Sequence, residues 1–467
     1  MKTTTRYLLV AAYFVLLLVF VRAIGFNGLY GQDAHEYYRY SKALLNWLQT
    51  GQNPGDYFWP VWYPLAGALV AYVTHLPVVF SLQLVSVISL CVVVWVALRW
   101  VQPYSLPAMV AACIGVALCP LLLRSGLVVM SDALSIAGVM LAMYCFKLFT
   151  EKPLPRYVYG FAIFGALAVM TRYASVVILF PPAIVMAYGI VLNRQWLSIV
   201  AGLLLVAIIC TPHVLIRHNT PLAFVNHNWV TSWSVRNFFS SNFFTPDGTL
   251  HYKLPNLVFC TAGLLHPGLG VLLAPVLLFV RRRDVTSLVN GVVVAAIVLY
   301  LLFLAGIPFQ NKRYFLPVIP LLFVVLAPAL QRALQFARYK VAALVLFASV
   351  SIVLFSWQFK ELYQRYRLEQ QLTALVQQQP QKILYTFDID VAIASYDTTL
   401  QLHNMFMQRY HTFDTGALVL FNPDKFAIQW QGRNPMLNWQ ELNSNYVLTP
   451  VAIQPDGWRL YKIEKHI

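Results

Sequence analysis

The sequence has little charge for its length. Only 11% of its 467 residues are Asp, Glu, Lys or Arg, whereas soluble domains carry about 25%. Hydrophobic residues make up 59% of the chain and recur in long apolar runs. This composition excludes an ordinary soluble protein and predicts that most of the chain is surrounded by lipid.

The sequence also lacks the marks of a disulfide framework. Its six cysteines include no CxxC pair, and all of them fall in apolar stretches. We therefore expect them to pack as small buried hydrophobic residues. The chain has no repeat of about 20 to 50 residues and no low-complexity tract, which excludes a repeat architecture.

Acidic residues are scarcer than basic ones. Seventeen Asp and Glu face thirty-three Lys and Arg, for a formal net charge of +16. In a soluble protein this excess would suggest a nucleic-acid partner. In a membrane protein it is explained by basic loops on the cytoplasmic side, so we expect membrane lipids and no nucleic acid as partners.

Long apolar runs predict about eleven membrane spans, each close to the length that crosses about 30 Å of hydrocarbon. The first run follows Lys2 and Arg6 without a small-residue cleavage site, which indicates a retained helix with a cytoplasmic N-terminus. The apolar segment 61–77 is interrupted by prolines, so we place it at the interface or as a re-entrant element. The predicted spans are 7–26, 79–98, 105–123, 127–148, 157–173, 175–192, 196–215, 256–280, 285–305, 314–334 and 341–357.

The loops between these spans differ between the two faces. The cytoplasmic face receives short basic loops, and the opposite face receives the long polar segments 27–62, 216–255 and 358–467. Function usually resides where the loops are long, which places it on the extracytoplasmic side. The basic loop residues are Arg99, Lys147, Lys152, Arg156, Arg194, Arg281, Arg282, Arg283, Arg332, Arg338 and Lys340.

The tail predicts a second domain. An amphipathic, charged stretch at 358–378 is typical of a helix, and alternating runs at 382–387, 416–421, 446–449 and 458–463 are typical of strands. We therefore expect an all-α polytopic membrane domain over residues 1–357. A small extracytoplasmic α/β domain should follow over residues 358–467.

An acidic loop follows the first predicted span. On a helix, Asp33, Glu36, Tyr37 and Tyr40 would share one face. A carboxylate at the interface can accept a proton from an acceptor hydroxyl or help to hold a divalent metal. The alternative is purely structural: Asp33 would cap the helix and Glu36 would complete a capping box.

A second acidic residue, Asp132, is predicted just inside a span. Ionisable groups in membrane segments are costly, so this residue is a functional candidate. The alternative is an ion pair with Arg124 or another arginine that only fixes helix packing.

Several basic residues lie on the face that should lack them. Arg124, Arg172, Arg217 and the pair Lys312 and Arg313 map to the extracytoplasmic ends of spans. A guanidinium group binds phosphate bidentately, so this set predicts an anionic lipid phosphate as ligand. The alternative for any single residue is snorkelling to lipid headgroups.

The loop 216–255 is rich in Asn, Trp, Phe and His, including Phe224, His227, Trp229 and Trp233. Aromatic faces and amides suit sugar rings and polyprenyl chains. An amphipathic interfacial helix without ligand contacts is the alternative.

Taken in order, these segments resemble the GT-C superfamily of membrane glycosyltransferases. The resemblance covers about residues 1–357, is strongest to the family 39-like branch related to protein mannosyltransferases and aminoarabinose transferases, and rests more on order and topology than on any one short motif. The segments that carry it are Asp33-Ala-His-Glu-Tyr-Tyr, Trp62-Tyr-Pro-Leu, Ser131-Asp132, Thr171-Arg-Tyr173 and Lys312 to Pro320.

The resemblance implies transfer of a sugar from a polyprenyl-phosphate donor on the extracytoplasmic face. It implies catalytic roles for Asp33 and Glu36, although relatives read Asp-Glu where this chain reads Asp33-Ala34. A divalent metal on Asp33 and Asp132 is left open, and no other cofactor is expected. The residues assigned to substrate binding are His35, Tyr37, Arg124, Asp132, Arg172, Tyr173, Lys312, Arg313 and Tyr314.

We therefore predict a glycosyltransferase of a cytoplasmic membrane that acts on a glycan, lipid or protein acceptor. One alternative is a lipid-glycan ligase or polymerase of the O-antigen ligase type, which would use His213, His218 and His227 around the loop 216–255. The other is a lipid or solute transporter, which should show polar residues near the middle of several spans.

Overall fold

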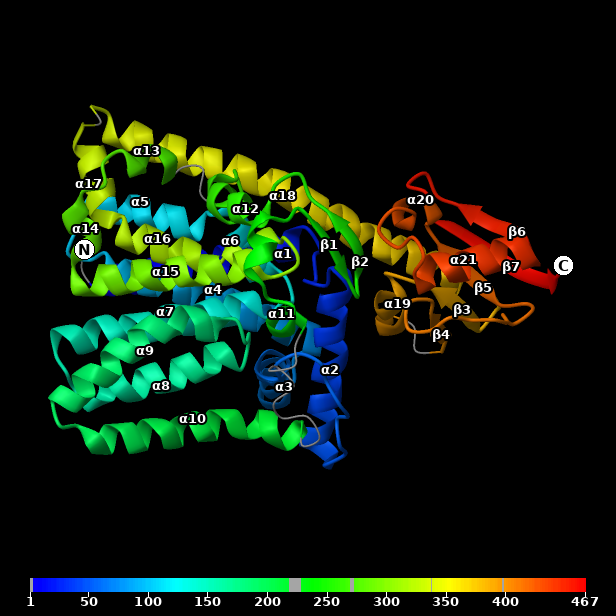
Figure 1. Cartoon of the computed structure of the whole chain (residues 1–467), viewed down its shortest axis with the longest axis horizontal. Coiled ribbons are helices and arrows are strands. Elements are labelled where there is room, and N and C mark those ends of the chain that lie inside the picture. The colour runs from blue at the N-terminus through cyan, green and yellow to red at the C-terminus, as the bar shows by residue number, and fades with distance from the viewer. Residues whose placement is uncertain (1–2, 218–227, 269–272, 337, 397–398) are drawn as a thin grey trace.

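Long apolar helices that run in one common direction form the body of the protein (Figure 1). The computed structural model describes residues 3–217, 228–268, 273–336, 338–396 and 399–467. Within these residues, seven helices are long and apolar enough to cross a membrane. They are α1 (Thr3–Ala23), α4 (Val78–Trp100), α7 (Asp132–Glu151), α9 (Ser175–Leu192), α10 (Trp196–Ile216), α15 (Leu288–Gly306) and α18 (Lys340–Gln377).

Burial within the bundle is uneven. Helices α4 and α7 are the most buried of the seven, whereas α10 exposes large apolar side chains such as Leu197, Leu203 and Ile208. Apolar residues on an outer helix face suit lipid and not water. The multi-pass membrane architecture expected from composition is therefore confirmed.

Two further apolar segments are bent. One bends by 53° before Pro120, and the other by 59° before Ala327-Pro328. Proline lacks an N–H donor and clashes with the preceding turn, so a bend is expected at each site. The helices concerned are α5 (Leu106–Ala117), α6 (Pro120–Leu127), η4 (Lys312–Phe315), α16 (Val318–Val325) and α17 (Ala327–Phe336).

The expected number of eleven spans is not confirmed. Counting each bent pair as one span, the described residues hold up to nine. The predicted span 157–173 is the shorter α8 (Pro155–Val169). The predicted span 256–280 begins with α12 (Asn256–Ala262) and η2 (Gly263–Leu265), and the C-cap of η2 is His266, just before Pro267.

The remaining short elements connect the helices. The loop after α10 holds α11 (Asn228–Thr231), η1 (Val235–Phe239) and an antiparallel hairpin of β1 (Asn242–Thr245) and β2 (Gly248–His251). Before α15 lie α13 (Ala274–Leu277) and α14 (Arg282–Thr286). The side chains of Phe224, His227 and Trp229, which were expected to bind sugar, lie outside the part of the chain that the structure describes.

Two helices lie across one end of the bundle and not along it. They are α2 (Gly31–Thr50) and α3 (Trp62–Thr74), and Figure 1 shows α2 crossing the ends of the long helices. Helix α2 buries one face, including Tyr37, Tyr40 and Leu44, and ends at Gly51, whose φ of 77° suits a glycine C-cap. Its first turn therefore lies where the long helices end.

Helix α18 joins the bundle to the C-terminal domain, a name we use for residues 358–467. Its 38 residues extend about 57 Å, roughly twice the thickness of a hydrocarbon core. Side chains up to Tyr366 pack in the bundle core, and Leu372 and Val376 pack in a separate core with the sheet. One uninterrupted helix therefore belongs to both regions.

The C-terminal domain contains a five-stranded sheet with the order β4-β3-β5-β7-β6. Strands β3, β4 and β5 are parallel, and β7 is antiparallel to β5 and β6. The predicted sheet domain is confirmed, and β4 is the strand that the pattern missed. The elements are β3 (Ile383–Thr386), α19 (Asp390–Tyr396), β4 (Gln401–Asn404), β5 (Leu418–Phe421), α20 (Pro423–Phe426), α21 (Asn434–Asn445), β6 (Tyr446–Ile453) and β7 (Arg459–His466).

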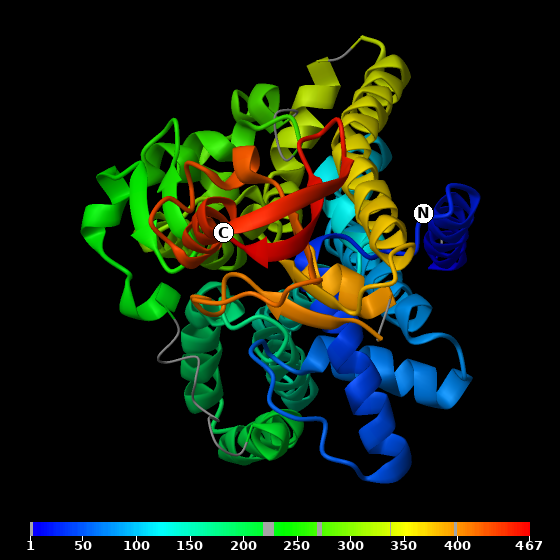
Figure 2. The ribbon, with the colours of Figure 1, turned by 90° about the vertical axis from the view of Figure 1, so that its right-hand side faces the viewer.

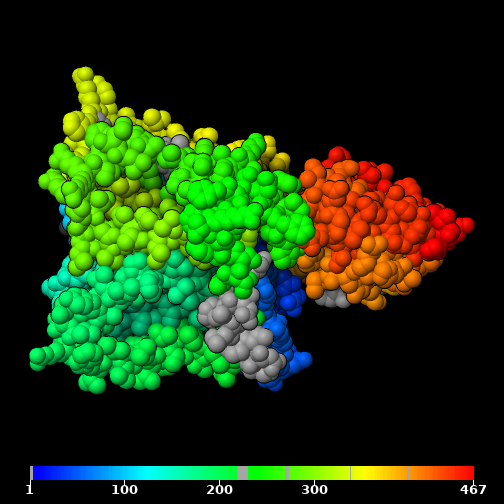
Figure 3. Space-filling view, viewed as in Figure 1, coloured from blue at the N-terminus to red at the C-terminus, as the bar shows by residue number. Residues whose placement is uncertain are grey.

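The C-terminal domain lies at one end of the bundle (Figure 1), and in Figure 2, which is seen from that end, it lies in front of the helices. The β1–β2 hairpin reaches it through backbone bonding, because Thr249 donates its N–H to the carbonyl oxygen of Gln429 over 2.9 Å. Figure 3 shows this green segment against the orange and red domain. The domain is thus fixed to the face that carries α2.

Candidate active site

Four charged residues from distant parts of the chain meet at the end of the bundle beneath the C-terminal domain. Asp33 lies in the first turn of α2, and Asp132 is the first residue of α7. Arg172 lies in the turn between α8 and α9, and Arg313 lies in η4. Each of them stands where a long helix begins or ends, because the bundle brings those ends together.

The four side chains alternate in charge. Arg172 Nη1 and Arg313 Nε donate to different oxygens of the Asp132 carboxylate. Arg313 Nη1 also donates to Asp33 Oδ2 over 2.8 Å. The result is a continuous row in the order Arg172, Asp132, Arg313 and Asp33, which we call the charged row.

Burial differs along the charged row. The Asp132 side chain is 3% exposed, and that of Asp33 is 40% exposed. A carboxylate buried this deeply must be paired, and the two guanidinium groups provide the pairing. Asp33 is thus the end of the row that solvent or a substrate can reach.

Tyrosines surround the charged row. The guanidinium carbon of Arg172 lies 5.0 Å from the centre of the Tyr314 ring, a distance typical of a cation–π contact. Tyr37 donates its hydroxyl to Ser131 over 2.8 Å, and burial raises the pKa of Tyr37 to about 12. Tyr37 therefore stays protonated and acts as a hydrogen-bond donor.

A small cavity of about 10 Å³ lies beside the row and is lined by Asp132, Arg172, Tyr300, Arg313 and Tyr314, among others. Such a volume corresponds to about one water molecule. Tyr300 was not predicted, because it lies in an uninterrupted apolar run whose pattern indicates only a span.

The capping role considered for Asp33 and Glu36 is wrong. Helix α2 begins at Gly31, and its N-cap is Tyr30, whose side chain makes no capping hydrogen bond. Glu36 instead forms an ion pair with Arg39, three residues later on the same helix. Glu36 is therefore held outside the charged row.

His35 also lies away from the charged row, although it is close in sequence. Its ring is completely buried and contacts Ser395 Oγ at 2.7 Å and Glu369 Oε2 at 3.3 Å. Both partners belong to the C-terminal domain. The structure thus gives His35 an interdomain position, and the partners could not be predicted because they are more than 330 residues away.

Three other expected binding residues have partners of their own. The Arg124 guanidinium carbon lies 5.0 Å from the centre of the Tyr30 ring. The ion pair considered for Asp132 is therefore present, but with the other arginines Arg172 and Arg313 and not with Arg124. Lys312 Nζ lies 2.7 Å from His266 Nε2. The Tyr173 hydroxyl contacts His213 Nε2 at 3.3 Å and accepts from Arg217 Nη1 at 3.5 Å.

The donor set does not suit a divalent metal. In the part of the chain that the structure describes, no three His, Cys, Asp or Glu side chains are grouped as metal ligands. Asp33 and Asp132 are bridged by the guanidinium group of Arg313, which places a positive charge between them. A metal shared by these two carboxylates would have to displace that group.

An apolar groove of about 420 Å³ runs along α8, α9 and α10. Small residues such as Gly165, Ala183 and Gly202 form part of its wall. The groove also includes Met170, two residues from Arg172. The apolar groove therefore begins near Arg172, the basic end of the charged row.

Comparison with known proteins adds a family and a fold. A profile of the Alg9-like mannosyltransferase family matches residues 13–403. No curated protein matches the chain. The crystal structure of ArnT from Cupriavidus metallidurans bound to undecaprenyl phosphate is similar with a TM-score of 0.64 and 12% identity, covering 98% of each chain. The apo state of the same protein gives 0.56 and 13%, over 97% of this chain and 98% of that one. At such identities, the likeness concerns the fold.

Proposed function

This chain belongs to the Alg9-like mannosyltransferase family, and on that premise we propose that it transfers a sugar from a polyprenyl-phosphate donor to an acceptor hydroxyl at the charged row. The expected GT-C superfamily membership is confirmed by the family match and by the ArnT-like fold. The chain is thus a membrane glycosyltransferase. The donor, the roles of the residues and the sidedness are our proposal.

The observation that carries the proposal is the pairing of two arginines with a buried carboxylate beside an accessible one. Asp132 holds the guanidinium groups of Arg172 and Arg313 at fixed positions. Two guanidinium groups held close together match the geometry of a phosphate. They would stabilise the charge that develops on the phosphate as it leaves.

The transfer needs a base for the acceptor hydroxyl, and we assign this role to Asp33. The acceptor oxygen attacks the anomeric carbon, the bond from that carbon to the phosphate oxygen breaks, and the hydroxyl proton passes to Asp33. A single displacement of this kind inverts the anomeric centre. Because Arg313 Nη1 is bonded to Asp33, a bound phosphate would compete for that group and leave the carboxylate to act as base.

The apolar groove is the place we propose for the polyprenyl chain. It is lined almost entirely by carbon and includes Met170, next to the turn that carries Arg172. A phosphate at Arg172 would therefore leave its lipid tail at the mouth of an apolar channel. The related fold of ArnT was solved with undecaprenyl phosphate bound, which supports this class of donor.

The charge of the loops supports an extracytoplasmic site. Helix α14, which carries Arg282 and Arg283, and helix α17, which carries Arg332, lie at the end of the bundle opposite the C-terminal domain (Figure 1). In a bacterial-type inner membrane, basic loops remain on the cytoplasmic side. The charged row and the C-terminal domain would then face outward.

Two alternative functions have less support than sugar transfer. The ligase or polymerase interpretation depends on three histidines, of which His213 contacts Tyr173 and the other two, His218 and His227, lie outside the described residues. The transporter interpretation expects polar residues at mid-membrane in several helices. Membership in a mannosyltransferase family favours neither.

The proposal is tested by measuring donor binding and sugar transfer separately in lipid nanodiscs. The ligands are short-chain polyprenyl phosphate and the same lipid carrying a hexose or a pentose, and membranes of the source cells supply the acceptor. We expect Arg313→Ala to weaken binding by about 2 kcal/mol or more. Asp33→Asn should keep binding and lose at least about 100-fold in transfer.

Glu36→Gln is the matched control, since Glu36 lies one turn from Asp33 but pairs with Arg39. It should keep both binding and transfer. Full transfer activity of folded Asp33→Asn would contradict the assignment of the base. Failure of the wild type to bind any polyprenyl lipid would contradict the proposed donor.

A further inference from the structure

The first turn of α2 has two faces with different partners. One face carries Asp33, which bonds to Arg313. The other faces the C-terminal domain: Gly31 donates its N–H to Glu369 Oε1 over 3.2 Å, and Gln32 Nε2 donates to Asp390 Oδ1 over 3.3 Å. The C-terminal domain therefore contacts the same helical turn that carries the proposed base.

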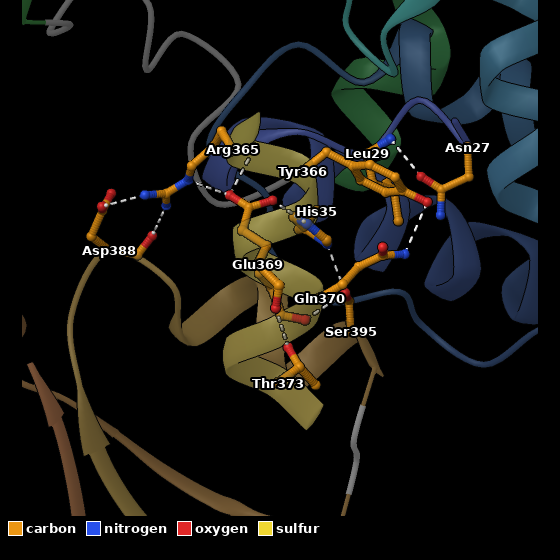
Figure 4. A network of polar contacts seen from close by, with 12 residues as sticks. Asn27, Leu29, His35, Arg365, Tyr366, Glu369, Gln370, Thr373, Asp388 and Ser395 are labelled. Carbon is orange, nitrogen blue, oxygen red and sulfur yellow. Dashed lines mark hydrogen bonds and ion pairs between the residues drawn. The ribbon is translucent and has the colours of Figure 1, made fainter. Parts of the chain in front are cut away.

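His35 completes this contact. Its two ring nitrogens lie against Ser395 Oγ and Glu369 Oε2, and Figure 4 shows the ring between α18 and α19. Glu369 thus contacts both the start of the helix and the ring one turn later. Two contacts fix both the position and the rotation of that turn.

The Glu369 carboxylate caps the N-terminus of α2 from outside the helix. The N-terminal N–H groups of a helix have no partner within it, and no side chain of α2 itself caps this end. A carboxylate there also interacts favourably with the helix dipole. Because Glu369 is only 1% exposed, little water competes for these contacts.

Glu369 is itself held by the sheet domain. Arg365 Nε donates to Glu369 Oε1 over 2.6 Å, and the same guanidinium group donates to Asp388 Oδ2 over 3.1 Å and to the Asp388 carbonyl oxygen over 2.9 Å. Asp388 is the second residue after β3 and also binds Lys425. A chain of contacts therefore runs from the sheet to the start of α2 (Figure 4).

From this arrangement we infer that the C-terminal domain sets the position of Asp33, with Glu369, His35 and Ser395 as positioning residues. The inference rests on the proposed role of Asp33 as base. These residues touch neither the arginines of the charged row nor the groove, so they act only through α2. A misplacement of about 1 Å in a reacting group can cost 100-fold in rate, whereas Arg172 and Arg313 are both held by Asp132 on α7, so we expect phosphate binding to change little.

The test compares kcat for transfer with Kd for polyprenyl phosphate in the full-length protein. Glu369→Ala and Ser395→Ala should lower kcat by about 100-fold and about 10-fold, respectively, and leave Kd within about twofold. Glu369→Gln keeps an amide oxygen for the Gly31 N–H and should restore most of the rate. Combined with Asp33→Asn, Glu369→Ala should cause no further loss, because both changes act on one proton transfer.

Arg409→Ala is the control in the same domain, since Arg409 pairs with Glu441 in an exposed contact away from α2. It should leave kcat unchanged. If Glu369→Ala does not fold, Ser395→Ala decides. Normal kcat in the folded Glu369→Ala or Ser395→Ala protein, with Asp33→Asn inactive, would overturn the positioning role alone. An active Asp33→Asn would instead overturn the proposed function.

Discussion

Asp132 is a carboxylate buried between two guanidinium groups, so its charge matters for stability as well as for the phosphate binding that we propose. Asp132→Ala leaves Arg172 and Arg313 without that counter-ion, and we expect the free energy of unfolding to fall by about 3 kcal/mol. Chemical denaturation of the purified protein measures this. The control is Asp56→Ala: Asp56 is 74% exposed and lies 3.8 Å from Arg217, so its loss should cost less than about 1 kcal/mol. Equal effects of the two changes would contradict a structural role for Asp132.

His266 predicts a pH dependence. Burial, followed by the neighbouring Lys312 ammonium, lowers the pKa of His266 below its usual range. The unfolded chain therefore binds a proton at about pH 6.5 that the folded protein resists. The contribution to stability is fully present above that pH and is lost as the pH falls through the lower, folded-state pKa.

His266→Gln should remove this pH dependence. We expect the wild type to lose thermal stability relative to His266→Gln between about pH 7 and pH 5. Thermal unfolding at a series of pH values measures it. Parallel pH profiles for the two proteins would show that His266 is not the group that titrates.

At the same scale, the residues of the charged row were predictable one by one, and their pairing was not. Asp132 stands out because an ionisable group inside a span is costly. Asp33 stands out because it shares a helix face with Glu36 in an outer loop, and Arg172 and Arg313 because the extracytoplasmic face should have few basic residues. Which arginine meets which carboxylate depends on how helices pack, and the local pattern says nothing about that. The resemblance predicts that His35 binds substrate, but His35 contacts Glu369 instead. Local sequence could not predict this contact, because Glu369 lies in another domain.

The β1–β2 hairpin is the element that best shows how a single backbone position fixes a contact between domains. Gly248 has a φ of +91°, and a Cβ there would lie 2.3 Å from the carbonyl oxygen of Gln429. Gly248→Ala should therefore strain the turn and push the hairpin from the C-terminal domain. We expect a loss of about 2 to 3 kcal/mol and faster proteolysis within residues 242–251.

Gly416→Ala is the matched control for this change. Gly416 has a similar φ of +85°, but a Cβ there would meet no atom within 4 Å. It should show the backbone strain alone, about 1 kcal/mol. If both variants lost the same stability, the contact with Gln429 would not contribute.

The apolar groove along α8, α9 and α10 predicts selectivity for lipid length. A Cβ at Gly202 would lie at ordinary contact distances from Ala162 and Val158, and the longer side chain of Gly202→Leu would occupy part of the groove that Gly202 lines. It should weaken binding of long polyprenyl phosphates by on the order of tenfold and spare short ones. Binding across a chain-length series checks this, with Gly202→Ala as control. Equal losses for every chain length would place the tail elsewhere.

The positions of the helices along the chain were predictable where hydropathy alone determines where a helix begins and ends. Runs of apolar residues located α4, α9, α10 and α15 closely. The bends before Pro120 and Pro328 and the break after His266 were harder, because a proline in an apolar run can either bend a span or end it. The neighbouring helices decide which of these occurs.

In the whole molecule, the membrane bundle and the C-terminal domain share helix α18, so the proposed role of Glu369 would connect the bilayer to the reaction. Helix α18 starts as a membrane span and carries Glu369 at its far end. A span tilts when its length does not match the bilayer, and a rigid helix tilts over its whole length. A change in bilayer thickness would then tilt α18 and displace its far end, and with it the first turn of α2. The acyl-chain length of the bilayer lipids should therefore change the rate of sugar transfer, even when no regulatory ligand is bound.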